Sequence, residues 1–310
     1  MEVQRSKAYP AHAIVDSAGL QRLWLEMKHY IALTKPRITA LILVCTGVGY
    51  CFGAVGGWRL WEFVHTLVGT ALMASGTAAL NQWYERDVDY KMRRTRGRPL
   101  PSGQIEPAHA LIFGLGVSFA GFLELWLGAN ALAGLAGLFT LASYLLVYTP
   151  LKKRSPICTA VGAIPGAMPP VIGYAAARGH VTWEALALFA ILFVWQFPHF
   201  YAIAWMYRED YARGGIRMLP VVRPDGASTA RQIVICSLLL IPVSLIPSYL
   251  HMTGAIYFAG AAFLGVDFLY FGLQVFCERT TQSARHVLLA SVIYLPALLS
   301  LMVYDRISSR

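Results

Sequence analysis

The sequence predicts an all-α, polytopic membrane protein with about nine transmembrane helices, and three observations lead to this fold class. Hydrophobic residues make up 57% of the 310-residue chain and charged residues only 14%, which is far from the composition of a soluble domain. Most apolar runs exceed the roughly 18 residues that make a spanning helix plausible. Lysine and arginine are concentrated in alternate connections between these runs, as the positive-inside rule requires of membrane proteins.

The apolar runs predict nine spans, at about 38–58, 61–83, 107–127, 129–150, 157–177, 181–205, 232–250, 254–277 and 286–304. The chain therefore divides into an N-terminal segment, residues 1–37, and one transmembrane domain, residues 38–310. Five apolar residues of the N-terminal segment fall at helical spacing and predict a short helix on the membrane surface: Leu20, Leu23, Trp24, Met27 and Tyr30. Lys35 and Arg37 precede the first span; they could have a functional role, but we interpret them as anchors at the membrane surface.

The distribution of positive charge predicts the orientation. With a cytoplasmic N-terminus, the internal segments hold 22 of the 26 lysine and arginine residues, and only Arg59, Arg178, Arg306 and Arg310 lie outside. The net charge of +10 is then explained by topology and by an anionic ligand, so we expect no nucleic-acid partner. Neither a cleavable signal peptide nor an acid-poor presequence is evident in residues 1–30, which favours a bacterial inner membrane and contact with membrane lipids.

The second span leads directly into an acidic cluster. Asn81, Glu85 and Asp89 lie at i, i+4 and i+8, so they share one face if the helix continues past the apolar run. Two carboxylates and an amide oxygen suit a hard cation such as Mg²⁺, which often arrives with a phosphorylated substrate. The alternative is that the acids only offset the neighbouring arginines of a cytoplasmic loop.

Basic residues follow the second and fourth spans on the same side of the membrane. Arg94 and Arg98 lie just after the acidic cluster, where they could bind phosphate oxygens. Lys152 and Lys153 follow the fourth span and could reach the same anion, although adjacent cations at a cytoplasmic helix end are usually a topology signal.

The fifth span is rich in glycine and proline, so we expect a broken or kinked helix. Its small residues could line a cavity for a large, flat substrate, or they could allow close packing of helices; both interpretations stay open.

The sixth span carries polar groups within an apolar stretch. His199, next to Pro198, could contact a metalloporphyrin, relay protons, or hydrogen-bond a carbonyl that the proline leaves free. After this span, acidic residues and Arg217-Met218-Leu219-Pro220 repeat the order found after the second span, where Arg98-Pro99-Leu100-Pro101 follows the acids. This repetition suggests two half-sites that face each other across a bundle.

Together these motifs resemble the UbiA-type intramembrane prenyltransferases. Asn81, Glu85 and Asp89 occupy the Asn, Asp and Asp positions of the family motif NDxxDxxxD, while Gln82 departs from its second position. The strings NQWYERDVDYKMRRTRGRPL, YTPLKKRSPICTAVGAIPGAMPPVIGY and WQFPHFYAIAWMYREDYARGGIRMLPVV are similar to the branch that farnesylates heme. The resemblance implies a bundle of two four-helix repeats, with a cytoplasmic cap over a lipid-accessible cavity.

The resemblance also implies a reaction, in which a farnesyl group passes from farnesyl diphosphate to a vinyl carbon of heme b with the help of Mg²⁺. The expected metal ligands and catalytic residues are Asn81, Glu85 and Asp89, with Glu209 or Asp210 as a further ligand. The diphosphate would be bound by Arg94, Arg98, Lys152, Lys153 and Arg208, and the heme by His199 and Trp195. Tyr207 and Tyr211 replace the two acids of the second family motif. Candidate protein partners are a heme A synthase or oxidase assembly proteins.

Two other functions are compatible with parts of the sequence. A prenyltransferase of an aromatic acid or quinone precursor would share the first motif, but the altered second motif and the string WQFPH argue against it. An organic-anion transporter would share broken helices and intramembrane charges, but transporters tend to place their binding groups near the midplane of the membrane.

Overall fold

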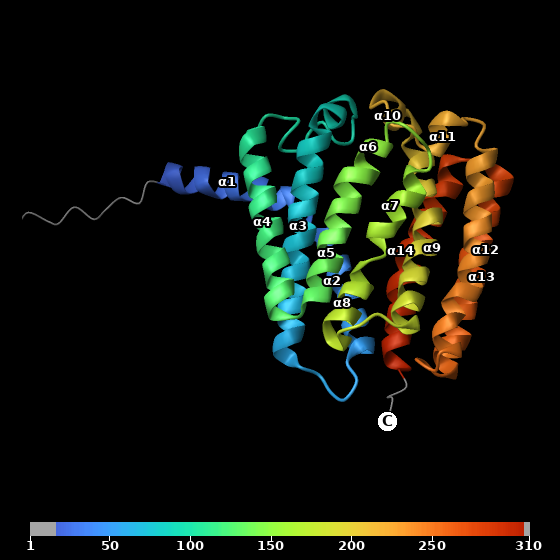
Figure 1. Cartoon of the computed structure of the whole chain (residues 1–310). Helices are drawn as coiled ribbons and strands as arrows, with labels where there is room; N and C mark the ends of the chain where they lie inside the picture. The colour runs from blue at the N-terminus through green and yellow to red at the C-terminus, as the bar shows by residue number, and fades with distance from the viewer. Residues whose placement is uncertain (1–16, 307–310) are drawn as a thin grey trace, which may run out of the picture.

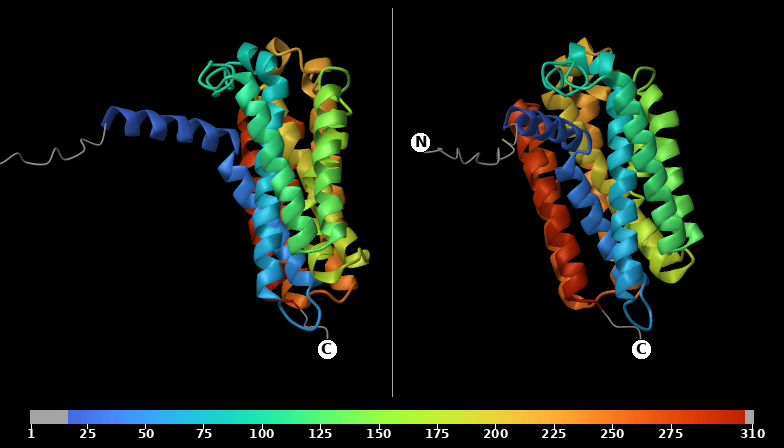
Figure 2. Two further views of the ribbon diagram at one scale, coloured as in Figure 1. Left: turned by 60° about the vertical axis from the view of Figure 1, so that its left-hand side comes forward. Right: turned by 90° about the vertical axis from the view of Figure 1, so that its left-hand side faces the viewer.

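The computed structural model describes residues 17–306, which form a bundle of upright helices with one helix, α1, extending sideways from it (Figures 1 and 2). The elements are α1 (Ser17–Leu33), α2 (Pro36–Gly53), α3 (Leu60–Lys91), α4 (Pro107–Gly128), α5 (Ala131–Ala142), the π-helical turn η1 (Ser143–Tyr148), α6 (Thr149–Leu151), α7 (Cys158–Gly166), α8 (Pro169–Arg178), α9 (Trp183–Met206), α10 (Arg208–Arg213), α11 (Leu219–Val222), α12 (Ala227–Tyr249), α13 (Ala255–Glu278) and α14 (Thr281–Tyr304). No strand occurs among these residues.

The prediction of an all-α, multi-pass membrane protein is confirmed. Within residues 17–306, nine helical stretches are long and apolar enough to cross a membrane. They are α2, α3, α4, the continuous stretch Ala131–Leu151, the broken stretch Cys158–Arg178, α9, α12, α13 and α14. The predicted surface helix corresponds to α1, whose apolar side chains such as Leu23 and Trp24 are exposed. The two four-helix repeats, the cytoplasmic cap and the lipid-accessible cavity stay predictions of the resemblance.

The second span is longer than predicted. The apolar run suggested an end near residue 83, but α3 continues to Lys91, where the Met92 amide bonds the Asp89 carbonyl. Within the span, α3 packs closely on α4: a Cβ added at Gly76 of α3 would lie 2.1 Å from the Ser118 hydroxyl oxygen. Small residues let two membrane helices approach in this way. The acidic cluster therefore lies on a rigid helix.

The fifth span is broken, as predicted, between α7 and α8. Proline at the start of α8 is compatible with a new first turn but not with a continuing helix. The break brings α8 against α2, where a Cβ at Gly173 would lie 1.9 Å from the Thr46 carbonyl oxygen. For this helix, the small residues serve close packing, which was one of the two open interpretations.

The charged connections gather at one end of the bundle, the upper end in Figure 1. The loop after α3, the turn after α6 and the short helices α10 and α11 lie there, and the Arg217 amide donates to the Lys152 carbonyl across 2.8 Å. The carboxyl end of α3 points into this layer, so the acidic cluster lies directly beneath it.

Candidate active site

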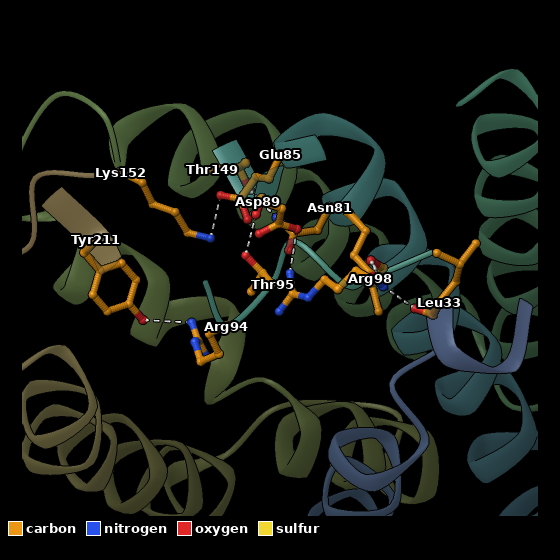
Figure 3. A network of polar contacts seen from close by, with 12 residues as sticks. Leu33, Asn81, Glu85, Asp89, Arg94, Thr95, Arg98, Thr149, Lys152 and Tyr211 are labelled. Carbon is orange, nitrogen blue, oxygen red and sulfur yellow. Dashed lines mark hydrogen bonds and ion pairs between the residues drawn. The ribbon is translucent and has the colours of Figure 1, made fainter. Parts of the chain in front are cut away.

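Asn81, Glu85 and Asp89 lie on one face of α3, as their spacing predicted, and their side chains point into the bundle (Figure 3). Asn81 is 2% exposed and Asp89 is fully buried. Burial of two carboxylates is costly unless other groups compensate their charge.

Each carboxylate is paired with a cation from another part of the chain. Lys152 Nζ lies 2.8 Å from Glu85 Oε1, and Arg98 Nη1 lies 2.7 Å from Asp89 Oδ2. These contacts bring together residues separated by 67 and 9 positions in the sequence. A buried ion pair offers little net stability over apolar packing, so its presence here points to a function.

Two tyrosines of the π-helical turn η1 surround Lys152. Its ammonium nitrogen lies 4.4 Å from the Tyr148 ring centroid and 5.9 Å from that of Tyr144. Burial alone would lower the pKa of Lys152, but Tyr148 and the Glu85 carboxylate outweigh it and raise this pKa well above the ordinary value. Single π-helical turns occur often at functional sites, and this one aims its aromatic faces at the charged pair.

Lys35, which the sequence predicts to be a surface anchor, is a further cation of the site. Its backbone is left-handed, with φ 49° and ψ 60°, an uncommon conformation for a residue other than glycine. Burial, followed by the nearby charges of Arg98 and Lys152, lowers the pKa of Lys35 to about 8. The only sequence signal was its place just before the proline that starts α2.

One carboxylate oxygen of the site has no partner. Asp89 Oδ1 is buried and makes no hydrogen bond to any residue in the described part of the chain. A buried oxygen of this kind suits a cation that the protein itself does not supply. No three His, Cys, Asp or Glu side chains among residues 17–306 form a metal cluster, so a metal here would need oxygen ligands from a substrate. Mg²⁺, which is often bound by one or two carboxylates plus substrate phosphates, fits this donor set.

Asp210 binds the loop that follows α3, residues 92–106. Its two carboxylate oxygens accept hydrogen bonds from the backbone amides of Arg93 and Arg94, at 3.0 and 3.1 Å, and Arg213 donates to it as well. Burial would raise the pKa of Asp210, but the hydrogen bonds from Arg213, Arg94 and Arg93 lower it. Both oxygens of this predicted metal ligand are thus engaged with the loop and Arg213.

The Arg94 backbone is held by Asp210, and the Arg94 side chain lies between two tyrosines. Its guanidinium carbon lies 5.0 Å from the Tyr207 ring centroid and 5.8 Å from that of Tyr211, and Arg94 donates to the Tyr211 hydroxyl at 3.5 Å (Figure 3). These are the residues that replace the acids of the second family motif. In this protein they bind an arginine.

The structure separates the remaining predicted residues of the upper end from the buried pairs. Lys153 and Glu209 are exposed. Arg208 donates to the Trp205 carbonyl at 3.0 Å and lies over the Trp205 ring. Of the five predicted diphosphate ligands, Arg98 and Lys152 therefore contact the acidic cluster, and Arg94 lies in the adjoining loop.

His199 and Trp195 lie on one face of α9, with their rings stacked at a centroid distance of 4.9 Å. His199 Nδ1 lies 2.7 Å from the Ser291 hydroxyl of α14, and the Trp195 indole donates to the Ser291 carbonyl at 3.0 Å. The histidine thus bonds a serine side chain and not a carbonyl freed by Pro198, which was one of the three alternatives. Trp195 is buried, whereas the His199 ring is only partly covered.

The chain matches the model of the UbiA prenyltransferase family over residues 42–295. The chain is 61% identical to a protein of Solibacter usitatus named protoheme IX farnesyltransferase, across 90% of this chain and 99% of that protein. It is 48% identical to a protein of the same name from Koribacter versatilis, across 90% of this chain and 94% of that protein.

Solved structures share the fold at low sequence identity. A structure described as digeranylgeranylglyceryl phosphate synthase in membranes matches with a TM-score of 0.76 and 17% identity, covering 90% of this chain and 98% of that one. A UbiA homologue from Archaeoglobus fulgidus bound to GPP and Mg²⁺ matches with a TM-score of 0.61 and 16% identity, covering 88% of this chain and 99% of that one.

Proposed function

This chain belongs to the UbiA prenyltransferase family, and from that premise we propose that it transfers a farnesyl group from farnesyl diphosphate to a vinyl group of heme b. The product is heme O, an intermediate in heme A biosynthesis. The observation that carries the proposal is the pair of partly buried carboxylate–cation contacts at the end of α3, in a chain 61% identical to a relative named for this reaction.

The reaction needs the site to stabilise charge of both signs. The bond between C1 of the farnesyl group and the diphosphate oxygen breaks, and the electron pair leaves with the diphosphate. The allylic cation then bonds the terminal vinyl carbon, which places positive charge on the carbon next to the porphyrin ring. Water adds there and loses a proton, leaving a hydroxyethylfarnesyl arm. Preorganised cations in a site of low dielectric constant stabilise the departing diphosphate far more than they would in water.

The donor set at the end of α3 fits a Mg²⁺ ion that arrives with the diphosphate. Asn81, Glu85 and Asp89 would hold it, and the unpartnered oxygen of Asp89 supports this choice. When bound, the ion supplies Lewis-acid stabilisation of the diphosphate oxygens.

Three cations of the chain lie where the diphosphate would bind. Lys152 and Arg98 neutralise the carboxylates in the free protein, and they exchange these partners for diphosphate oxygens when the substrate binds. Lys35 adds a further charge, and an anion beside it favours its protonated form. Arg94, whose backbone amide donates to Asp210, closes the site from the loop that follows α3.

The aromatic residues near the charged pairs suit the allylic cation. Tyr144 and Tyr148 present ring faces beside Lys152, at the point where the diphosphate would leave. Such faces stabilise a cation while keeping out water, which would otherwise capture it and give farnesol.

We place the protein in the bacterial inner membrane with its N-terminus in the cytoplasm, because that orientation puts 22 of 26 lysine and arginine residues on the inside. The active site then faces the cytoplasm. Direct contact with a heme A synthase or oxidase assembly proteins stays a prediction.

The test is an assay of purified protein in detergent with heme b, farnesyl diphosphate and Mg²⁺, with the pigments followed by mass spectrometry. We expect a heme that carries a hydroxyethylfarnesyl arm, and we expect EDTA to prevent its formation. Prenylation of 4-hydroxybenzoate with unmodified heme would overturn the choice of acceptor. Folded protein that prenylates neither acceptor would favour the transporter instead.

A further inference from the structure

One serine of α14 contacts both aromatic rings that the sequence assigned to the heme. The backbone carbonyl of Ser291 accepts the Trp195 indole N–H at 3.0 Å, and its hydroxyl oxygen lies 2.7 Å from His199 Nδ1. Trp195 and His199 are four residues apart, so they project from the same face of α9. Ser291 is fully buried. A single residue therefore fixes two neighbouring rings.

The direction of the bond between Ser291 and His199 follows from the single proton of the hydroxyl. Ser291 Oγ lies 2.6 Å from the Leu288 carbonyl, which can only accept, so the hydroxyl proton points to that carbonyl. The hydroxyl oxygen then has only lone pairs left for His199, and Nδ1 must be the donor. This assigns the neutral imidazole its tautomer: Nδ1 carries the hydrogen, and Nε2 has a free lone pair.

The rest of the ring is held in place by packing. Trp195 stacks on it at an interplanar angle of 23°, and the Phe200 ring meets it nearly edge-on, at 67° and 5.5 Å between centroids. With one nitrogen tied to α14 and one face covered by indole, the ring has little freedom to rotate. Because Nδ1 is tied to Ser291, the nitrogen that stays available for a ligand is Nε2.

We propose that Ser291 is a positioning residue, which presents the unprotonated Nε2 of His199 to the iron of the heme substrate. This inference rests on the proposed function for its ligand, but the chemistry is that of His–metal sites in general. A ligating histidine usually donates its other N–H to an acceptor, which fixes the tautomer and makes the imidazole a stronger donor to the metal. The ligand bond holds the porphyrin at one height and angle, so that one vinyl group can meet the allylic cation.

The experiment compares wild-type protein with the variants His199→Ala, Ser291→Ala and Ser291→Thr, using ferrous heme b as the probe without farnesyl diphosphate. We measure the heme dissociation constant by titration and the iron–histidine stretching band by resonance Raman spectroscopy. Wild type should show this band, and His199→Ala should lose it. Ser291→Ala should weaken heme binding by about 10- to 100-fold and shift the band, as expected for loss of the acceptor of a ligand's N–H. Ser291→Thr, which keeps the hydroxyl, should restore both.

The matched control is Ser237→Ala, which removes another fully buried serine hydroxyl, one without a hydrogen-bond partner among residues 17–306. It should leave affinity and band unchanged. If Ser291→Ala leaves the band and the affinity at wild-type values, or if His199→Ala does, the inference is wrong. The assay with farnesyl diphosphate distinguishes failure of this inference from failure of the proposed function. If wild type farnesylates heme but Ser291→Ala leaves the band and the affinity unchanged, only the positioning role is refuted. If Ser291→Ala changes both but wild type does not farnesylate heme, only the proposed activity is refuted.

Discussion

The two segments that repeat one sequence order, the end of α3 and the region from α9 to α10, place their acids differently. In the first, α3 runs unbroken to Lys91, so Glu85 and Asp89 stay on a buried face of the bundle. In the second, α9 ends at Met206, Tyr207 leaves helical geometry with φ −112° and ψ 22°, and α10 begins again. Asp210 therefore lies on a short separate helix, where it binds loop amides. Because α3 is continuous, its acids face the bundle interior. Because the helix breaks at Tyr207, Asp210 binds the loop that follows α3 instead.

Under the proposed function, the carboxylates at the end of α3 take part in the reaction, whereas Asp210 in the α9–α10 region has a structural role. The first segment pairs two carboxylates with Arg98 and Lys152, side chains whose charges a diphosphate could recruit. The second pairs a carboxylate with backbone amides, which no substrate can displace easily. Substitutions at the end of α3 should therefore lower turnover, whereas substitutions at Asp210 should lower the stability of the folded protein.

The largest effect should come from neutralising the acids of α3. Glu85→Gln and Asp89→Asn each remove a charge that the proposed Mg²⁺–diphosphate complex would need, so each should lower kcat by about 10²- to 10³-fold. Together they should abolish product formation in the heme farnesylation assay. Asp87→Asn is the matched control, because the Asp87 side chain is 84% exposed, and it should keep wild-type turnover. Unchanged turnover in the double variant would remove the acids of α3 from the mechanism.

Next in size is the loss of the partner of Glu85. Lys152→Met leaves the partly buried Glu85 carboxylate without its ion-pair partner, which should cost up to about 3–5 kcal/mol of stability. It should also raise the KM for farnesyl diphosphate. Lys153→Met changes the exposed neighbour and should do neither. The measurements are thermal unfolding in detergent and the KM of each variant.

A second substitution separates stability from function at this pair. In Glu85→Gln with Lys152→Met, no charge is left unpaired, so stability should recover while turnover stays low. If Lys153→Met were as harmful as Lys152→Met, the difference between these adjacent lysines would not exist in solution.

Much of this arrangement follows from local sequence. Hydropathy located nine spans because each must bury about 20 apolar residues in lipid, and the spacing of Asn81, Glu85 and Asp89 put them on one face because the helix continued. Lys152 was predicted as a diphosphate ligand from its place after a span, but Lys153 shared that place, and only the exit geometry of the turn distinguishes them.

Other features depend on contacts that no local pattern encodes. Lys35 reaches the site through a left-handed backbone at the start of α2, and Ser291 is a small polar residue in an apolar helix whose partner lies 92 positions away. The resemblance predicted Asp210 as a metal ligand, and the break at Tyr207, which places Asp210 on a separate short helix, leaves no signal in composition. These residues became visible only when distant helices were brought together.

The smallest effect should be the pH dependence of stability that Asp210 confers through its contact with the loop that follows α3. Its carboxyl has a pKa below the ordinary value of 3.8 in the folded protein. The stabilisation is therefore complete at pH values above that ordinary value, and it is lost as pH falls through the lower folded-state pKa. Asp210→Asn, which accepts fewer hydrogen bonds and cannot titrate, should lower Tm at neutral pH, and the difference from wild type should shrink as the solution becomes acidic.

The matched control for this titration is Glu209→Gln on the same short helix. Glu209 is exposed and has no ion pair or hydrogen bond among the described residues, so its substitution should leave Tm nearly unchanged at every pH. Thermal unfolding in detergent across the acid range, for wild type and both variants, measures these differences. A Tm difference between wild type and Asp210→Asn that stays constant with pH would mean that the charge of the Asp210 carboxylate does not contribute to its contacts with the loop and Arg213. Turnover should fall less in Asp210→Asn than in Asp89→Asn, because the first loosens the loop that holds Arg94 and the second removes a charge from the site.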